Sequence, residues 1–409
     1  MSLLPSGLPR SALRIVVVAA ALVAVGCGDE TIPALSDDDP AQPAYLQTPR
    51  GDRQLPSGVI AIAWEGQGET RFVVEEPLPA GYSVETVASG LDNPVDLAFL
   101  PDGRILVTEQ FSGLIRMIDQ GLLLDEPFAE IEDVVQDQLE QGLLGIAIDP
   151  DFQRNHWVYV FYVEAAEDAA DFPSRSVLLR LTESGGIGGD PQELAELPFG
   201  PAGQHNGGGV RFGPDGKLYV TLGDTTRAEL AADPSETVGK ILRLEPNGGP
   251  AAGNPFLDTP GADPRVYATG FRNVFGIAFH PSLPNGLIAL DNAEFEGDEI
   301  DIVRPGLHYG WPDGDGERPI WSYLNAIGPA GAVVYTGDEL PEFQGDLFFC
   351  QFHVGGMLHR VQLSADLTKV LSDSIAARGC GSSVAQGTDG LLYFLDRTSG
   401  ELNRIARVD

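Results

Sequence analysis

The sequence predicts an all-β protein whose main body is a six-bladed β-propeller of four-stranded blades, preceded by a signal peptide and a flexible tether. A unit of similar pattern recurs after about residue 80, at spacings of roughly 50 to 65 residues. Each copy is an apolar strand, a turn resembling Pro-Asp-Gly and a second apolar strand, and amphipathic helices are scarce. A period of this length built from short strands is typical of a propeller.

The copies account for the chain from Val95 to its C-terminal end. They begin at Val95, Leu144, Gly209, Phe275, Ala332 and Ser383. A four-stranded sheet cannot bury both of its faces alone, so we expect the blades to pack face to face around an axis. Tandem β-sandwiches would instead need separate cores and linkers, and the sequence shows no linker after Val95. Because the chain ends in a strand, we expect ring closure to join that strand to strands from the N-terminal side.

Residues 1–27 are typical of a secretory signal. Arg10 and Arg14 precede an apolar run over 15–25, which is too short to span a membrane comfortably. Small residues end the run and are followed by Cys27, an arrangement that resembles a bacterial lipobox. We therefore expect Cys27 to be the acylated first residue of the mature protein, with an ordinary cleaved signal as the alternative.

Residues 28–57 are rich in Pro and Asp and poor in large apolar residues, which predicts a disordered acidic tether. The propeller domain is assigned to residues 58–409. Strand-like patches between residues 58 and 75 are expected to form an edge element or a strand pair that precedes the repeats.

The chain is strongly acidic, with 25 Lys and Arg against 60 Asp and Glu and a formal net charge of −35. It lacks the basic face that nucleic acid requires, and its charge does not attract it to an anionic membrane. Membrane contact is therefore expected only through a lipid on Cys27, on a protein exported to the periplasm or held at the outer membrane. In such an oxidising compartment Cys350 and Cys380, which lie in successive repeats, either form a disulfide or stay as buried free cysteines.

Three motifs in the repeats form a specific combination. They are His-Asn-Gly-Gly from His205, Gly-Phe-Arg-Asn from Gly270, and Asp-Glu-Ile from Asp298 with Tyr-Gly-Trp-Pro from Tyr309. With them, residues 82–409 resemble the glucose/sorbosone dehydrogenase family, six-bladed propellers related to the soluble quinoprotein aldose dehydrogenases. The resemblance implies pyrroloquinoline quinone (PQQ), held with Ca²⁺ over the channel mouth, as hydride acceptor while an aldose C1 hydroxyl is oxidised to the lactone.

The resemblance assigns His205 as the general base, a role that suits an imidazole with an ordinary pKa of about 6.5. Arg272 matches the arginine that hydrogen-bonds the quinone oxygen on which charge develops, and Asn273 beside it would contact the cofactor. The family's cofactor-binding glutamine falls at Glu140 or Gln141. Judged without the family, His205 would simply be held by the backbone of a glycine-rich loop, and Arg272 would form a surface ion pair.

The resemblance also implies two calcium sites. Backbone carbonyls at Ala293 and Glu294 would hold the ion of the cofactor. Glu299 and the carbonyl of Tyr309 would hold a structural ion, with Asp298 alongside, and hard oxygen ligands of this kind suit calcium. The alternative is that Asp298 and Glu299 are solvated turn residues.

Three cations that the family uses for the quinone carboxylates are missing from the matching positions. The lysine aligns with His353 or Gln351, and the two arginines before the sixth copy align with Cys380 and Ser382. Arg378 lies two residues earlier. Each charge-assisted contact contributes roughly 1.5–3 kcal/mol, so their loss is expected to weaken PQQ binding, with His353 compensating in part where it is protonated.

Three functions are therefore open. The first is an exported, PQQ-dependent sugar dehydrogenase with a small-molecule sugar substrate; its electron acceptor is unknown, since the chain has no CxxCH haem motif. The second is a non-catalytic propeller that binds a sugar or a protein partner, which the missing cations favour. The third is a calcium-dependent lactone hydrolase. Its ligands would come from Glu140, Asn206, Asn273 and Glu294. The missing cations favour the third function as well as the second, whereas the retained His205 and the Arg272-Asn273 pair favour the first.

Overall fold

The structure is a computed structural model that describes residues 45–46, 53–54, 59–65, 69–76, 78–135, 140–165, 175–199, 203–293, 297–323, 326–352 and 355–408. Side chains are described for Val73 and from residue 75 onward. The chain divides into two compact units, residues 1–59 and 60–409. In the first unit a strand pair is described, β1 (Tyr45–Leu46) and β2 (Arg53–Gln54). The expected signal over 1–27, with Cys27, lies outside the described residues.

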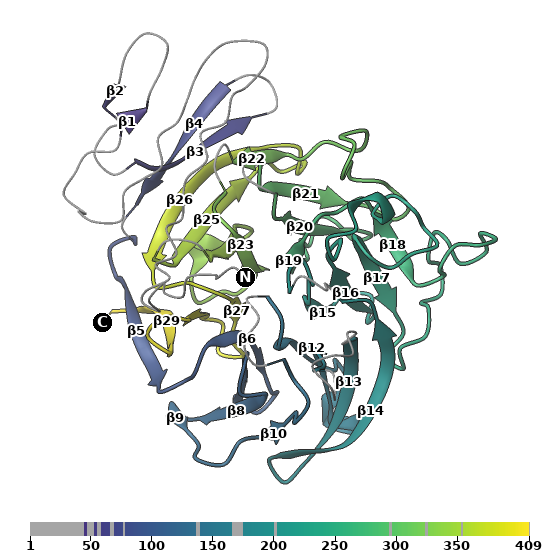
Figure 1. Ribbon diagram of the computed structural model, residues 1–409. Helices are drawn as coiled ribbons and strands as arrows, with labels where there is room; N and C mark the ends of the chain where they lie inside the picture. Colours follow the sequence, from purple (N-terminus) through teal and green to yellow (C-terminus); the bar gives the residue numbers. More distant parts are fainter. Residues whose placement is uncertain are drawn as a thin grey trace, which may run out of the picture. The chain divides into compact units, whose positions relative to one another are not determined.

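The second unit is a six-bladed propeller with four strands in each blade, which confirms the predicted fold (Figure 1). Blades one to three contain β6 (Pro94–Phe99), β7 (Ile105–Glu109), β8 (Leu114–Asp119) and β10 (Ala129–Glu130), then β11 (Leu143–Ile148), β12 (Trp157–Val163), β13 (Ser176–Ser184) and β14 (Ile187–Leu197), then β15 (Val210–Phe212), β16 (Leu218–Leu222), β17 (Lys240–Leu244) and β18 (Val266–Thr269). Blades four to six contain β19 (Val274–Ala278), β20 (Leu287–Asp291), β21 (Glu299–Val303) and β22 (Trp321–Tyr323), then β23 (Pro329–Val334), β24 (Leu347–Gln351), β25 (Met357–Leu363) and β26 (Val370–Arg378), then β27 (Val384–Gln386), β28 (Leu392–Asp396), β29 (Glu401–Arg407) and β5 (Tyr82–Ser89). The remaining short elements of this unit are β9 (Leu122–Leu123), α1 (Phe152–Asn155), η1 (Ala228–Leu230) and η2 (Pro341–Phe343). No described helix has the length and apolar character needed to cross a membrane.

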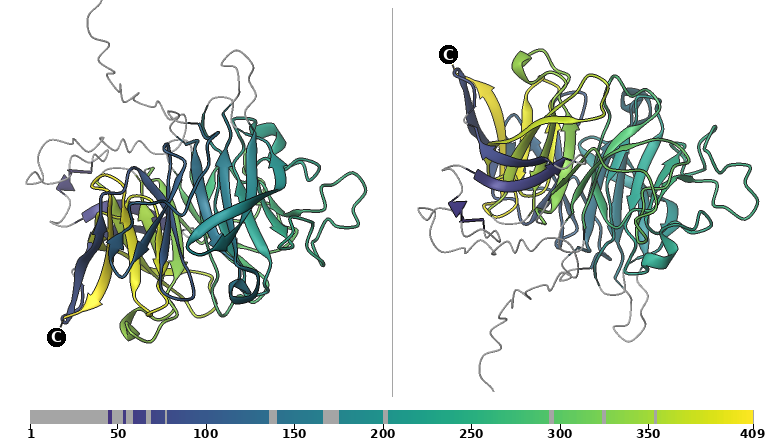
Figure 2. Two further views of the ribbon diagram at one scale, coloured as in Figure 1. Left: turned by 90° about the horizontal axis from the view of Figure 1, so that it is seen from below. Right: turned by 90° about the horizontal axis from the view of Figure 1, so that it is seen from above.

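The ring is closed by the two ends of the repeat region. The first strand, β5, is the outer strand of the last blade and pairs antiparallel with the last strand, β29, with Val84 opposite Ile405. Both views in Figure 2 show these strands side by side. The expected closure between the C-terminal strand and an N-terminal strand is therefore confirmed.

A hairpin formed by β3 (Val59–Glu65) and β4 (Glu69–Glu75) joins two blades. It lies between β22 of blade four and β26 of blade five, so these two blades form one continuous sheet of ten strands. Val73 is buried in the core shared by these blades. The strand-like patches predicted between residues 58 and 75 are thus a connection between two sheets.

The hydrophobic core consists of the layers between neighbouring blades. The second strand of each blade carries a run of large apolar residues, and β7, β16, β20 and β24 are buried along their whole length. Both faces of such a strand are covered because a blade stands on each side. This explains why the repeats show continuous apolar runs rather than strict alternation.

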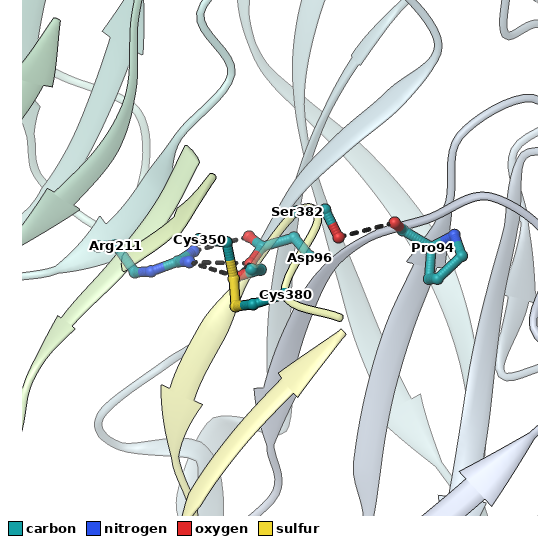
Figure 3. Close-up of a disulfide and its surroundings, with 7 residues drawn as sticks. Pro94, Asp96, Arg211, Cys350, Cys380 and Ser382 are labelled. Carbon is teal, nitrogen blue, oxygen red and sulfur yellow. Dashed lines mark hydrogen bonds and ion pairs between the residues drawn. A yellow bond between two sulfur atoms is a disulfide. The ribbon is translucent and has the colours of Figure 1, made fainter. Parts of the chain in front are cut away.

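An ion pair crosses the central channel. Arg211 Nη1 and Nη2 donate to the Asp96 carboxylate, over 2.7 and 2.8 Å, and join the inner strand of blade three to that of blade one (Figure 3). The Ser383 hydroxyl of blade six and the Ile146 N–H of blade two also donate to the Asp96 carboxylate. Four blades are therefore tied to one buried carboxylate on the axis.

A disulfide lies near this ion pair. Cys350, in β24, is bonded to Cys380, in the segment between β26 and β27, with 4.9 Å between their Cα atoms (Figure 3). The bond attaches blade five to the segment that leads into blade six, as the disulfide alternative of the sequence analysis anticipated.

Candidate active site

A cavity of about 720 Å³ lies at one end of the central channel, and His205 is part of its wall. Every blade contributes a residue near the start of its inner strand. These residues are Val95, Leu144, Gly207, Phe275, Pro329 and Ser382. The cavity is therefore a product of the closed ring and not of any single blade.

Glycines bring the inner strands close together. A Cβ atom on Gly209 would lie 2.2 Å from the carbonyl oxygen of Phe275 in the next blade. One on Gly276 would lie 2.1 Å from the carbonyl oxygen of Ala330 in the blade after that. No side chain fits in either place, so backbone packs directly on backbone and sets the spacing of the loops around the cavity.

His205 stands on the glycine-rich loop before β15 with a left-handed backbone, at φ 55°. This conformation is unfavourable for a residue with a Cβ atom, by about 1–3 kcal/mol, and must be held by contacts. The His205 N–H donates to a Glu140 carboxylate oxygen over 2.6 Å, and the His205 carbonyl accepts the N–H of Thr225. Both backbone groups of His205, its N–H and its carbonyl, are therefore held by hydrogen bonds.

The hydrogen bonds of His205 determine its tautomer. Arg272 Nη2 lies 2.8 Å from His205 Nε2, and a guanidinium can only donate. His205 Nε2 is therefore the acceptor, and Nδ1 carries the proton, which it donates to Asp224 Oδ1 over 2.7 Å. The lone pair needed by a general base is on the nitrogen nearer to Arg272.

Asp224 orients the histidine. Besides His205, it accepts the Thr226 N–H at Oδ1 and the Trp311 indole N–H at Oδ2, each over 2.8 Å. Burial alone would raise the pKa of Asp224, but these hydrogen bonds and the neighbouring imidazole hold that pKa below its usual value. Asp224 is therefore an ionised carboxylate behind the imidazole.

Arg272 is positioned by the segment that follows β20. Its Nη1 donates to the carbonyls of Asn292 and Ala293, each over 2.7 Å. The backbone N–H groups of Arg272 and Asn273 both donate to the Asp291 carboxylate, over 2.9 and 2.7 Å. The guanidinium thus bridges the histidine and a pair of carbonyls.

Glu140 and Asn273 complete the loop around His205. A Glu140 carboxylate oxygen accepts the Asn273 side-chain N–H over 3.1 Å, and Asn273 Oδ1 accepts the Gly207 N–H over 3.1 Å. Glu140 lines the cavity, whereas Gln141 is buried and its carbonyl accepts the side-chain amide of Gln110. Of the two positions offered for the family's glutamine, Glu140 is the one on the cavity wall.

Of the two residues expected to hold the cofactor's calcium, Ala293 is described, and its carbonyl accepts from Arg272 over 2.7 Å. Asp298, expected beside the structural ion, accepts the backbone N–H groups of Ala293, Ile327 and Gly328 over 2.7–2.9 Å. Glu294 lies outside the described residues. Among the residues that the structure describes, no three His, Cys, Asp or Glu side chains are grouped as a metal site.

Glu299, on β21, pairs with Asp291 of the neighbouring strand β20. Asp301 is two residues further along β21 and lies on the same face of the sheet as Glu299. Burial and the charges of Asp291 and Asp298 raise the pKa of Glu299 to about 8. Burial and the charge of Glu299 raise the pKa of Asp301 well above its usual value, and neither Asp301 oxygen has a described hydrogen-bond partner. These carboxylates are therefore poorly stabilised as anions.

Tyr309 packs next to β21, and its ring stacks on that of Phe271 with 4.9 Å between ring centres. Its hydroxyl donates to the Ile302 carbonyl and accepts the Arg304 N–H. The backbone carbonyl of Tyr309 is the group expected to bind a structural ion.

The positions that lack the family's cations take other roles. Gln351 faces the interior of blade five, where its oxygen lies 3.0 Å from His359 Nε2. Cys380 is in the disulfide, and the Ser382 hydroxyl donates to the Pro94 carbonyl over 2.9 Å (Figure 3). Arg378 pairs with Glu75 on the exposed surface rather than entering the cavity. His353 lies outside the described residues.

Several residues of the cavity wall were not anticipated from the sequence. They are Gln110, Asp224, Trp311, Phe352 and Arg397. Asp224 and Arg397 each follow the second apolar strand of a repeat. An acidic or basic residue at that recurring place is the signal that could have identified them.

The match to known proteins covers most of the chain. Residues 91–404 match the sequence profile of the family described as glucose/sorbosone dehydrogenase. The protein slr1608 of Synechocystis is 30% identical over 78% of this chain and 85% of its own length. Aldose sugar dehydrogenase YliI of Escherichia coli is 27% identical over 80% of this chain and 94% of its own. The PQQ-bound form of the aldose sugar dehydrogenase of Streptomyces coelicolor has 30% identity and a TM-score of 0.66 over 80% of this chain and 99% of that one.

Proposed function

Because this chain belongs to the glucose/sorbosone dehydrogenase family, we propose that it is an exported quinoprotein that oxidises the C1 hydroxyl of an aldose to the lactone, with PQQ as hydride acceptor. The observation that carries the proposal is the series Asp224–His205–Arg272 on the cavity wall. It supplies an oriented base and a fixed cation within one hydrogen bond of each other.

His205 acts as the base through Nε2. A sugar hydroxyl that enters the cavity takes the place of Arg272 Nη2 as the donor to this nitrogen. When the proton moves from the hydroxyl to Nε2, the imidazole becomes a cation, and the ionised Asp224 stabilises it. Arg272, released from the histidine, donates to oxygen on which negative charge develops.

The residues of the cavity suit a planar, anionic cofactor. The volume of the cavity lies within the range of small-molecule sites, about 300–1,000 Å³. Two guanidinium groups, of Arg272 and Arg397, and the flat side chains of Trp311 and Phe352 lie on its wall. When bound, PQQ supplies the two-electron acceptor for the hydride that leaves C1.

The two calcium expectations differ in how well the residues suit them. The Ala293 carbonyl, expected to hold the cofactor's ion, already accepts from Arg272, and no step is assigned to a calcium ion there. Asp298, expected beside the structural ion, instead accepts three backbone N–H groups. The unpartnered Asp301 oxygens beside Glu299 do suit a hard cation. We therefore assign the structural calcium to Glu299, Asp301 and the Tyr309 carbonyl.

Three of the four ligands expected for the calcium-dependent hydrolase are described, and they lie together around the His205 loop. Glu140 is occupied by the His205 N–H and the Asn273 amide, and the Asn206 amide lies 3.4 Å from the Glu140 carbonyl. In this structure these groups bond to one another and to His205.

The decisive experiment is reconstitution. The purified protein is mixed with PQQ and Ca²⁺, and its absorption is recorded before and after aldoses are added. Bleaching of the oxidised quinone is expected in the wild type and in the surface control Arg378→Gln, and not in His205→Gln. Failure of the wild type to retain PQQ at micromolar concentration would refute the proposal. Undiminished turnover in His205→Gln would refute the role of the base.

A further inference from the structure

Arg397 is a cation that the cavity acquires from the turn after β28. Its side chain lines the cavity, and Nη2 donates to the Gln110 side-chain carbonyl. Its guanidinium carbon lies 5.7 Å from the ring centre of Phe111 and 5.6 Å from that of Phe352. Amide and aromatic groups therefore hold the side chain without neutralising its charge.

The charge of Arg397 has no carboxylate partner among the described residues. Several other arginines in this acidic chain pair with acids, as Arg243 does with Asp215 and Arg360 with Asp346. Burial lowers the pKa of Arg397, and the acid that opposes this effect, Asp92, acts from beyond ion-pair distance. An anionic group in the cavity would therefore meet a guanidinium that is not already paired.

The place of Arg397 in the fold relates it to the missing cations. A Cβ atom on Gly381 would lie 3.2 Å from the Cβ of Arg397, and the Gly381 N–H donates to the Leu395 carbonyl over 2.9 Å. Gly381 stands between Cys380 and Ser382, the two positions without the expected arginines. The neighbouring strand thus brings a guanidinium alongside the segment from which two are absent.

We propose that Arg397 binds a carboxylate of the quinone cofactor and replaces the cations missing at Cys380 and Ser382. This inference rests on the proposed function, since it takes PQQ as the occupant of the cavity. The other carboxylates on the wall are engaged with donors other than Arg397, because Glu140 and Asp224 accept from His205 and Asp298 accepts from the Ile327 N–H.

The test compares dissociation constants for PQQ in the wild type, Arg397→Gln, Arg397→Lys and the surface control Arg378→Gln, measured by equilibrium dialysis in the absence of sugar. Arg397→Gln should bind about tenfold to a hundredfold more weakly, the worth of one charge-assisted contact. Arg397→Lys keeps the charge but cannot form a bidentate contact, so its dissociation constant for PQQ should lie between those of the wild type and Arg397→Gln. Arg378→Gln should bind as the wild type does, and the melting temperatures of the cofactor-free proteins should be alike.

A second ligand separates charge recognition from general damage to the site. The trimethyl ester of PQQ has no carboxylate, so Arg397→Gln should bind it nearly as well as the wild type does. An equal loss for the acid and the ester, or equal binding of the acid by Arg397→Gln and the wild type, would overturn the assignment and leave the proposed function standing. If the wild type itself does not bind PQQ, both fall. Should Arg397→Gln fail to fold, the comparison of Arg397→Lys with the wild type on the two ligands decides in the same way.

Discussion

Replacing Asp224 by Asn keeps the size of the side chain but removes the charge behind His205. Asp224 accepts at both oxygens, from His205 and Thr226 on one side and from Trp311 on the other. An amide offers an acceptor on only one side, so its NH₂ group must face a donor. If it faces His205, the proton moves to Nε2, where it meets the Arg272 N–H and the base is lost.

The expected effect on catalysis follows from two terms. The imidazolium loses a charge-assisted hydrogen bond, worth about 1.5–3 kcal/mol, where a neutral one contributes about 0.5–1.5 kcal/mol. In addition, only the fraction of molecules with the proton on Nδ1 can act as base. Together these lower kcat by about 10²–10⁴-fold, or roughly 3–5 kcal/mol of activation free energy.

The assay is dye reduction by the PQQ-loaded enzyme at saturating aldose, with Asp215→Asn on the same blade as a control. The dissociation constant for PQQ should change much less than kcat. A variant that keeps kcat within about threefold of the wild-type value would refute the role of Asp224.

The remaining predictions concern stability. Calcium should raise the melting temperature of the wild type and of the exposed control Asp366→Asn but not that of Asp301→Asn; an equal rise in all three would exclude the ion from Asp301. Burial lowers the pKa of Lys240 to about 7, against about 10.4 for lysine in an unfolded chain, so the unfolded state binds more protons between these values. The free energy of unfolding, measured in urea titrations, should therefore rise by about 2 kcal/mol from pH 7 to pH 9. Lys240→Met should remove this pH dependence; an unchanged pH dependence in the variant would contradict the lowered pKa of Lys240. Changing Cys350 and Cys380 together to Ser should lower the free energy of unfolding by about 3–4 kcal/mol, the value for a closed loop of 30 residues. Two reactive thiols besides Cys27 in denatured, unreduced protein would instead show that the bond is absent.

The blades could be predicted from sequence because their pattern is local. An apolar strand, a turn and a second apolar strand identify a hairpin from adjacent residues alone. The place of the β3–β4 hairpin could not be predicted in this way. Strands pair through backbone groups, so the order of apolar and polar residues in the hairpin does not reveal that its partners are β22 and β26.

The site was predictable where a motif carried the residue. His205, Arg272, Asn273 and Glu140 lie in recognisable stretches, and the structure brings them together around one loop. Asp224 was missed because an acid at the end of a strand resembles a solvated turn residue. Its bond to the Trp311 indole joins segments 87 residues apart.

Arg397 was missed for a different physical reason. A comparison position by position looks for a cation at the same place in the chain, whereas a ligand responds to charge at a place in space. The turn after β28 lies against Gly381, so a residue 15 positions or more along the chain can serve the same volume as one at Cys380 or Ser382.

The pairing of β5 with β29 has a thermodynamic consequence. Residues of all six blades line the cavity. Separating β5 from β29 would therefore open the ring and disrupt the binding site, even if the other blades stayed folded. A ligand in the cavity therefore binds only the closed ring, and mass action makes it oppose the opening. At a hundred times its dissociation constant it adds about 2.7 kcal/mol to the cost of separating the chain's two ends, although it touches neither strand.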